Sequence, residues 1–253
     1  MTDDIPANKE LWAGLRQHTA ARIGLKRSGA SLSTGPMLDF KLAHAQARDA
    51  VHAPLDVARM ATDLDGLGLP VLSVASAVKD KQEYLMRPDI GRCLTASAQA
   101  TLVAHAGTYD LAFVISDGLS ARAVQEHARP VLADFLPQLR AQNWRIAPLV
   151  VARYGRVAIG DAIATALHAE CVVVLIGERP GLSASDSMGA YLTWRPGPQT
   201  TDADRNCISN IRPGGIGYAD ADFKLGHLLD AIRAGRQSGV MLKDTSERLL
   251  IGR

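Results

Sequence analysis

The chain has 253 residues, of which 47% are hydrophobic and 21% charged, a composition typical of a globular protein and unlike that of a disordered one. Its formal net charge of only +2 argues against a nucleic-acid-binding or membrane-surface protein, whose basic residues would be in excess and gathered in a patch. No apolar run approaches the roughly 18 residues that a membrane span needs, and the polar start MTDDIPANKELW is not typical of a secretory signal.

The cysteines are few and widely spaced, at Cys93, Cys171 and Cys207, with no C-x-x-C pair. Neither a disulfide framework nor a structural zinc site is therefore expected, and the reducing cytoplasm is the default compartment.

The chain is expected to open with an amphipathic helix that frays into the glycine-containing segment GLKRSGASLSTGP. The apolar positions of this helix are Leu11, Leu15, Ile23 and Leu25. Two more helices are expected to follow, over residues 37–52, after a Ser–Thr pair that can cap the helix, and over residues 55–67. We therefore predict a small helical N-terminal domain over residues 1–66, followed by an α/β domain over residues 67–253.

From residue 69 onward, short apolar and β-branched runs alternate with helical stretches. The predicted strands are 70–76, 111–116, 146–154 and 171–177, and the predicted helices are 92–106, 120–141, 159–169 and 221–235. Continuous apolar runs are typical of strands buried on both faces, and their alternation with helices is typical of a parallel sheet. The sequence therefore predicts an α/β fold with a doubly wound, mostly parallel, Rossmann-like sheet.

Such sheets bind ligands outside the carboxyl ends of their strands. The segments at these ends, 116–120, 155–161 and 177–183, contain several glycines. These glycines either let the backbone approach a ligand closely or serve the turns that any α/β fold needs, and both interpretations stay open. Residues 184–220 have weak secondary-structure signals and many polar side chains, so we expect a long functional or interaction segment there, with a solvated loop as the alternative.

The common catalytic signatures are absent from the sequence. There is no G-x-G-x-x-G after a strand, no Walker loop, no G-x-S-x-G and no H-E-x-x-H. His44 and His52 are eight residues apart, too far to share one metal ion easily, and no metal ligand is predicted. Asp117 and Glu178 follow different strands, but their spacing does not fix a distance between them. The pattern favours a binding protein over a self-contained enzyme, and we predict no catalytic residue.

Five segments of the chain form a recognisable set. They are SGASLSTGPMLDFKLAHAQARDAVH, FVISDGLSARAV, GRVAIGDAI, VVVLIGERPGLSASDSMGAYLTW and DRNCISNIRPGGIGYADADFKLGHLL. Together they resemble the small (light) subunit of ethanolamine ammonia-lyase, over about residues 11–235. The run GERPGLS-x-x-D-S-x-G-A-Y-L-T followed by RNCISNIRP is highly specific for that family.

The resemblance implies a lyase that uses adenosylcobalamin to convert ethanolamine to acetaldehyde and ammonia. It places the substrate and the radical chemistry in a large TIM-barrel subunit, with which the small subunit joins in a higher hetero-oligomer. It also implies a bacterial microcompartment as the location. The apolar stripes of the N-terminal helices exceed what a three-helix unit can bury, so we expect them to contact the large subunit.

The cobalamin contacts of the family carry over onto Val157 in GRVAIGD, Glu178 in GERPG and Cys207 in RNCIS. The chain has no D-x-H-x-x-G motif, which in other proteins supplies a histidine to cobalt, so the cofactor is expected to keep its own dimethylbenzimidazole as lower ligand (base-on). The competing hypothesis is a self-sufficient hydrolase or transferase that uses Asp117, Glu178 or Cys207 directly. A cysteine without a placed histidine is weak support for that alternative.

Overall fold

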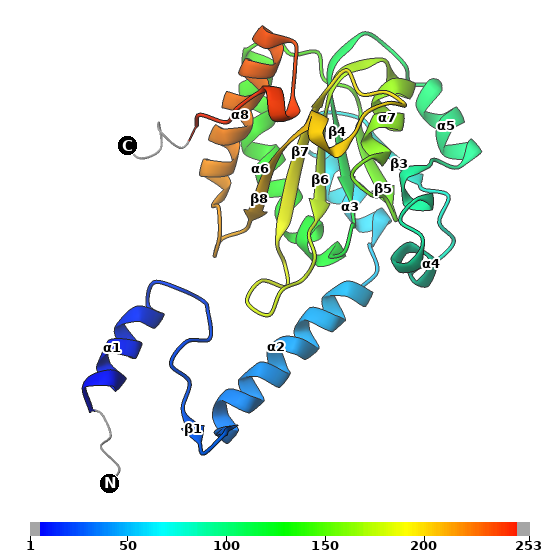
Figure 1. Cartoon of the computed structure of the whole chain (residues 1–253). Helices are drawn as coiled ribbons and strands as arrows, with labels where there is room; N and C mark the ends of the chain where they lie inside the picture. Colours follow the sequence, from blue (N-terminus) through cyan, green and yellow to red (C-terminus); the bar gives the residue numbers. More distant parts are fainter. Residues whose placement is uncertain (1–5, 247–253) are drawn as a thin grey trace.

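The computed structural model describes residues 6–246. Within them, a mixed six-stranded sheet carries helices on both faces, and a helical arm precedes it (Figure 1). No helix of this described part is long and apolar enough to cross a membrane.

The arm, residues 6–52, consists of α1 (Pro6–Arg16), a two-stranded ribbon of β1 (Arg27–Ser28) and β2 (Ser31–Leu32), and α2 (Thr34–His52). The expectation that the first helix reaches Ile23 and Leu25 is wrong. The chain instead reverses after α1, and the Arg16 guanidinium donates hydrogen bonds to the carbonyls of Ile23 and Gly24. Gly24 has a φ of +56° and packs on Trp12, where a Cβ would lie 2.4 Å from the indole.

The second and third predicted helices are confirmed as α2 and α3 (Val57–Asp65). Ser33 is the N-cap residue of α2, one of the two expected, but its side chain makes no capping bond and its hydroxyl donates to the Lys26 carbonyl instead. Asp56 caps α3 by accepting the Arg59 amide.

The main sheet has the strand order β3-β5-β4-β6-β7-β8. Its strands are β3 (Val71–Ala75), β4 (Tyr109–Ser116), β5 (Leu149–Arg153), β6 (Ala169–Gly177), β7 (Met188–Trp194) and β8 (Arg205–Ile211). The first four in spatial order are parallel, and β7 and β8 are antiparallel to their neighbours. The predicted mostly parallel sheet and its four strands are confirmed.

The expectation that residues 184–220 lack regular structure is wrong, because this segment contains β7 and β8 and the short 3-10 helix η2 (Asp202–Asp204). The β8 sequence RNCISNI is a poor strand signal, since most of its residues are polar. Its partner β7 lies between β6 and β8 and is mostly buried, whereas β8 forms the sheet edge and keeps polar side chains facing solvent.

Alternate residues of each central strand face the two helical layers. Leu111, Phe113 and Ile115 of β4 belong to the core cluster with α3, α6 (Ala121–Ala141) and α8 (Tyr218–Gly235). Ala112 and Val114 belong to the cluster with α5 (Ala96–Val103) and α7 (Ile159–Leu167). Both faces are thus covered, which explains the continuous apolar runs in the sequence. Shorter helices complete the chain: α4 (Lys81–Met86), η1 (Ile90–Arg92) and η3 (Gly239–Met241).

The third helix packs with the sheet and not with the arm. Met60 and Leu64 of α3 are buried in the same cluster as Phe113 and Leu136. The predicted domain boundary near residue 66 stays a prediction about independent folding, whereas the packing unit around the sheet, which we call the body, runs from α3 to η3.

The arm extends on the side of the sheet where the parallel strands end, as Figure 1 shows with α2 below the β6–β7 loop. A hydrogen bond joins the arm to this loop, in which the Arg22 guanidinium donates to the Leu182 carbonyl at 3.3 Å. The arm and the carboxyl edge of the sheet therefore face the same side of the molecule.

Candidate functional site

The carboxyl ends of β4, β5 and β6 lie next to one another. Ser116, the last residue of β4, is paired with Ala152 of β5 and with Ile176 of β6. The chain leaves β4 for α6 on one face and leaves β5 for α7 on the other, so the β4–β5 pair is a point where the winding direction changes. Sheets of this kind bind ligands at such points, and this edge is the candidate site.

A hollow of about 230 Å³ opens at this edge. Its lining comprises Tyr84, Gly118, Leu119, Arg156, Val157, Ile176, Gly177, Glu178, Arg179 and Tyr191. Two of the three predicted contact residues, Val157 and Glu178, therefore line one cavity although they follow different strands. Cys207 is not part of the lining, but it is exposed and paired with Tyr191 across β7 and β8.

The Glu178 carboxylate is held by three donors of the protein itself. Its Oε1 accepts the Ser209 hydroxyl at 2.5 Å, and its Oε2 accepts the Asn210 amide at 3.1 Å and the Ser187 hydroxyl. Gly189 leaves room for this side chain, because a Cβ at that position would lie 3.0 Å from Oε1. The carboxylate is thus fixed in place. Oε2 already accepts two donors, and Oε1 keeps lone-pair capacity for one more.

A β-bulge places two of these donors. The β7–β8 register slips by one residue between Met188 and Ala190, so that β8 carries an extra residue there. Asn210 lies in the bulge with a φ of +62°. The bulge turns the Ser209 hydroxyl and the Asn210 amide toward Glu178, an arrangement that the sequence pattern of β8 did not reveal.

Glu178 forms no ion pair with an arginine among the described residues. Arg205 instead makes two bonds of 2.7 Å to the Asp161 carboxylate, in a buried pair that joins β8 to α7. Arg212 lies 4.0 Å from Asp186. The Glu178 carboxylate is therefore stabilised by hydroxyl and amide donors and not by a charged partner.

The glycines at the strand ends serve close packing of the protein. A Cβ at Gly177 would lie 2.0 Å from the Ser120 carbonyl oxygen, and one at Gly155 would lie 2.6 Å from the Ser116 hydroxyl. Gly118 has a φ of +52°, and a Cβ there would lie 2.3 Å from the Gly177 carbonyl. Of the two interpretations left open by the sequence, the turn and packing requirement accounts for these positions.

Cationic side chains surround the aromatic wall of the hollow. The Arg156 guanidinium lies 4.0 Å from the centre of the Tyr84 ring, and the Lys81 ammonium lies 4.8 Å from it. The same Arg156 donates to the Tyr84 carbonyl, and Lys81 donates to the Gly118 carbonyl. Arg179 adds a second positive charge to the lining itself, beside that of Arg156. Sequence reasoning missed Lys81 and Tyr84, because they come from α4, outside the strand-end segments.

Asp117 lies beneath this wall and faces inward. Its Oδ1 accepts the Tyr154 amide at 2.7 Å, and the residue is 1% exposed. Burial raises the pKa of Asp117 to about 6, against the opposing charge of Lys81. Burial likewise lowers the pKa of Lys81. Asp117 therefore serves the β4–β5 junction and is not presented to the hollow.

The thiol of Cys207 has no feature that would activate it. Desolvation raises the pKa of Cys207, with a hydrogen bond to Tyr191 opposing this effect. A raised pKa keeps the sulfur in its protonated form, which is the weak nucleophile. Cys207 is suited to contact a ligand and not to attack one.

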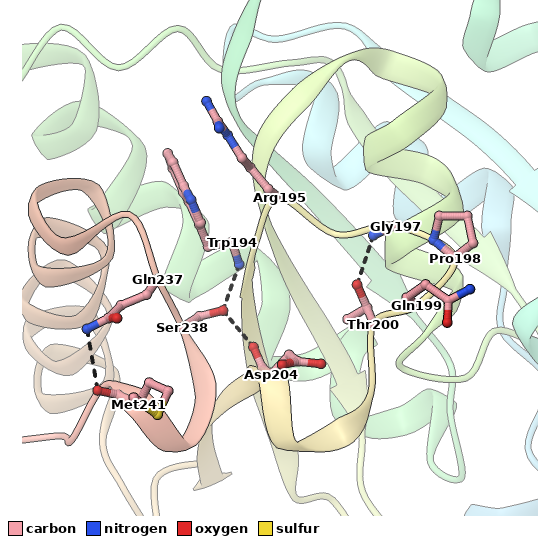
Figure 2. Close-up of a pocket in the computed structure, with 10 residues that line it drawn as sticks. All are labelled: Trp194, Arg195, Gly197, Pro198, Gln199, Thr200, Asp204, Gln237, Ser238 and Met241. Atoms are coloured by element: carbon pink, nitrogen blue, oxygen red, sulfur yellow. Dashed lines mark hydrogen bonds between the residues drawn. The ribbon is translucent and has the colours of Figure 1, made fainter.

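A larger depression of about 480 Å³ lies at the opposite edge of the sheet (Figure 2). Trp194, which ends β7 there, is paired with Cys171 at the start of β6. The polar groups in this depression bond to one another: the Trp194 amide donates to the Ser238 hydroxyl, which donates to the Asp204 carbonyl. None of the predicted contact residues lines it, so it is not the candidate site.

The fold and the strand-end hollow define an α/β protein with a candidate ligand site on the side of a protruding arm. The sequence profile of the ethanolamine ammonia-lyase light chain matches residues 9–243. An ethanolamine ammonia-lyase small subunit from Ralstonia nicotianae is 48% identical over 97% of this chain and 93% of its own length. Counterparts from Azotobacter vinelandii and Pseudomonas putida are 49% and 48% identical, over 98% and 96% of this chain and 93% and 90% of their own lengths. The chain belongs to the ethanolamine ammonia-lyase small subunit family.

Proposed function

We propose that this chain is the small subunit of an adenosylcobalamin-dependent ethanolamine ammonia-lyase and binds the cofactor jointly with a large catalytic subunit. One observation carries the proposal. Val157 and Glu178, which the family resemblance nominates, line a single hollow at the carboxyl edge of the sheet, and Cys207 is adjacent through Tyr191. Residues separated widely in sequence thus meet where an α/β sheet binds ligands.

The chemistry of the hollow fits the rim of a corrin. Corrin carries neutral amide side chains, which need fixed acceptors and an apolar floor. Val157, Ile176 and Tyr191 supply apolar surface, and the remaining lone pair on Oε1 of the anchored Glu178 carboxylate supplies an acceptor. The cations Arg156 and Arg179 suit the phosphate of the cofactor's nucleotide tail.

The size of the hollow supports a shared site. A cavity of about 230 Å³ can take one edge of a cobalamin and not the whole molecule. The rest of the cofactor must then be covered by another chain. We propose that the large subunit, a TIM barrel in the family resemblance, provides this cover.

The arm supports the same division of labour. Leu38 and Leu42 of α2 are 59% and 60% exposed, and Met37 and Phe40 are also exposed on this helix. An apolar surface of this kind marks a protein interface. Because the arm extends on the side of the candidate site (Figure 1), a partner seated on it would also reach the cofactor.

The role of this chain in the reaction is to bind and orient. When bound, adenosylcobalamin supplies the radical chemistry that converts ethanolamine to acetaldehyde and ammonia. Glu178 and Cys207 hold the cofactor's edge, Val157 forms part of its floor, and the strand-end glycines keep this edge compact. No catalytic residue is assigned to this chain.

The competing hypothesis of a self-sufficient hydrolase or transferase has less support. Asp117 is buried and bonded to the Tyr154 amide, so it cannot act as a base in the hollow. Cys207 has a raised pKa, and the Glu178 carboxylate is held by three protein donors from β8 and the β6–β7 loop. These three groups do not form a nucleophile and base pair.

Further features rest on the family resemblance alone. We propose that the cofactor is bound base-on, that the complex is a higher hetero-oligomer, and that it acts in a bacterial microcompartment or otherwise in the cytoplasm. Electron paramagnetic resonance of the reduced cobalt would test base-on binding, because coordination of the cobalt by a nitrogen atom splits its signal.

Coexpression with a candidate large subunit tests the central proposal. We expect a red complex with a cobalamin spectrum and acetaldehyde production only when both chains are present. The purified single chain should neither turn over ethanolamine nor retain the cofactor. Turnover by the single chain would contradict the division of labour, and a colourless, inactive complex would contradict the assignment of this chain to the cofactor site.

A further inference from the structure

A buried histidine faces two carboxylates at the carboxyl edge of the sheet, outside the hollow. His127 belongs to the second turn of α6, and its side chain is only 4% exposed. Glu126 precedes it on the helix, and Asp186 lies in the loop between β6 and β7. One possible ligand atom from each of these three residues lies within 4.8 Å of the others.

The ring of His127 is fixed on one side and unpartnered on the other. Its Nδ1 is 2.8 Å from the Tyr218 hydroxyl at the start of α8. Its Nε2 is buried and has no hydrogen-bond partner among the described residues. Buried polar atoms in native proteins are nearly always satisfied, so this nitrogen requires a partner.

The Asp186 carboxylate faces this nitrogen, with its Oδ2 3.8 Å from Nε2. This separation is too long for a hydrogen bond. A tetrahedral zinc ion, with bonds of roughly 2.1 Å, holds two ligand atoms about 3.4 Å apart. A bridging water, with bonds of roughly 2.8 Å, holds its two partners about 4.5 Å apart. The observed gap is closer to that of two ligands on one ion.

The surrounding groups orient the carboxylates and leave one oxygen of each free for a metal. Arg122 contacts Oε1 of Glu126 at 2.7 Å, and Arg212 approaches Oδ1 of Asp186 at 4.0 Å. Oxygens held in this way by an outer partner are typical of metal sites, as is a histidine whose other nitrogen is hydrogen-bonded. The two arginines also reduce the repulsion between the carboxylates.

We propose that Glu126, His127 and Asp186 bind a divalent zinc ion. One imidazole nitrogen and two carboxylate oxygens are ligands that zinc accepts, with a water in the fourth position. The ion ties the β6–β7 loop to α6. The sequence did not indicate this site, because Asp186 lies far along the chain from the adjacent pair Glu126 and His127, and the three show no metal-binding spacing.

The site has a structural consequence for its neighbourhood. The β6–β7 loop begins at Glu178 and contains Ser187, whose hydroxyl holds the Glu178 carboxylate. The same loop is bonded to Ser120 through the Ser185 carbonyl. Zinc at Asp186 therefore fixes the loop between these two anchors.

Isothermal titration of the chelator-treated full chain with zinc tests the proposal. We expect one site whose affinity falls at least about tenfold in Asp186→Asn and in Glu126→Gln, two changes at residues outside the core. Asp134→Asn, which removes an exposed carboxylate from the same helix, serves as the matched control and should bind as the native chain does. Zinc should also raise the melting temperature of the native chain and of the control, but not that of Asp186→Asn.

Cobalt(II) separates this site from the exposed thiols of Cys93 and Cys207. Bound at the proposed site, cobalt should give visible d–d bands without the intense near-ultraviolet band of thiolate ligation. An affinity that is unchanged in Asp186→Asn, a thiolate spectrum, or no binding would overturn the proposal. Because none of these measurements uses cobalamin or the large subunit, their outcome is independent of the proposed function.

Discussion

Two helices of similar length in this molecule use their apolar side chains in opposite ways. α2 in the arm has 19 residues and buries only Ala43 and Ala50. α6 in the body has 21 residues and buries ten of them. Both have apolar residues at helical spacing, but α6 lies on the sheet and next to α8, whereas α2 projects beyond it (Figure 1).

The difference separates two meanings of an amphipathic pattern. In the body, apolar stripes are covered by this chain and stabilise its fold. In the arm they are left exposed, so the hydrophobic free energy is available for association with another chain. Stability of the isolated chain should therefore depend on the body, and assembly should depend on the arm.

The largest expected effect is on the core of the body. Phe113→Ala should lower the free energy of unfolding by about 3–5 kcal/mol, because it empties a fully buried site where Phe113 meets Phe135 edge-on. Leu42→Ala in the arm is the matched control and should change it by less than about 0.5 kcal/mol. Chemical denaturation of the isolated chain measures the free energy of unfolding of both variants. Equal losses would contradict the distinction between the two regions.

The next effect concerns assembly. Deleting residues 1–35 removes α1 and the β1–β2 ribbon and leaves α2 without its preceding segment. We expect affinity for the large subunit to fall about a hundredfold, or about 2.7 kcal/mol, while the unfolding transition of the body is retained. Size-exclusion chromatography measures complex formation with the large subunit, and calorimetry measures the unfolding transition of the body. Complex formation that is unchanged after the deletion would remove the basis for assigning the arm to the interface.

A third prediction concerns a carboxyl group that is buried in the body without a hydrogen-bond partner for one of its oxygens. Asp222 on α8 is 5% exposed, and its Oδ1 has no hydrogen-bond partner among the described residues. Burial, with a smaller contribution from Asp134, raises the pKa of Asp222 from 3.8 to about 7. The folded state therefore binds this proton more tightly than the unfolded chain, so the contribution of Asp222 to stability is greatest below pH 4 and falls as the pH rises to about 7.

Asp222→Asn should remove this pH dependence. We expect it to stabilise the chain by about 2 kcal/mol at pH 8 and by almost nothing near pH 4, in denaturation curves recorded at both values. Asp134→Asn should give a smaller gain at pH 8, since it removes only the neighbouring charge. A loss of stability at pH 8 in Asp222→Asn would mean that the charged form is favoured by a partner.

The smallest effect tests the site. Glu178→Gln keeps the shape of the side chain but replaces one acceptor oxygen by a donor, which opposes the donors Ser187, Ser209 and Asn210. We expect cobalamin affinity of the complex to fall about tenfold, or about 1.4 kcal/mol. Ser209→Ala removes one donor without changing the charge and should have a smaller effect. A lower melting temperature with unaltered cofactor affinity would make Glu178 a structural residue only.

Much of the body could be predicted from its local sequence. The runs that form β4 and β6 are continuously apolar because helices cover both faces of the sheet. The polar turns after these runs indicated where the strands end and hence which residues lie at the carboxyl edge of the sheet. The edge strand β8 could not be found in this way. Its polar residues are explained only by the sheet edge and by the bulge that holds Glu178.

The sequence by itself determined the α/β class, four of the six main strands, the longer helices of the body and the family. These follow from periodicity, turn residues and specific motifs, which act over short stretches of chain. Only the tertiary structure decided what Glu178 binds, that Arg205 belongs to Asp161, that α2 is left exposed and that His127 meets Asp186. Each of these depends on contacts between residues far apart in the chain, and a local pattern carries no information about which distant surfaces will meet.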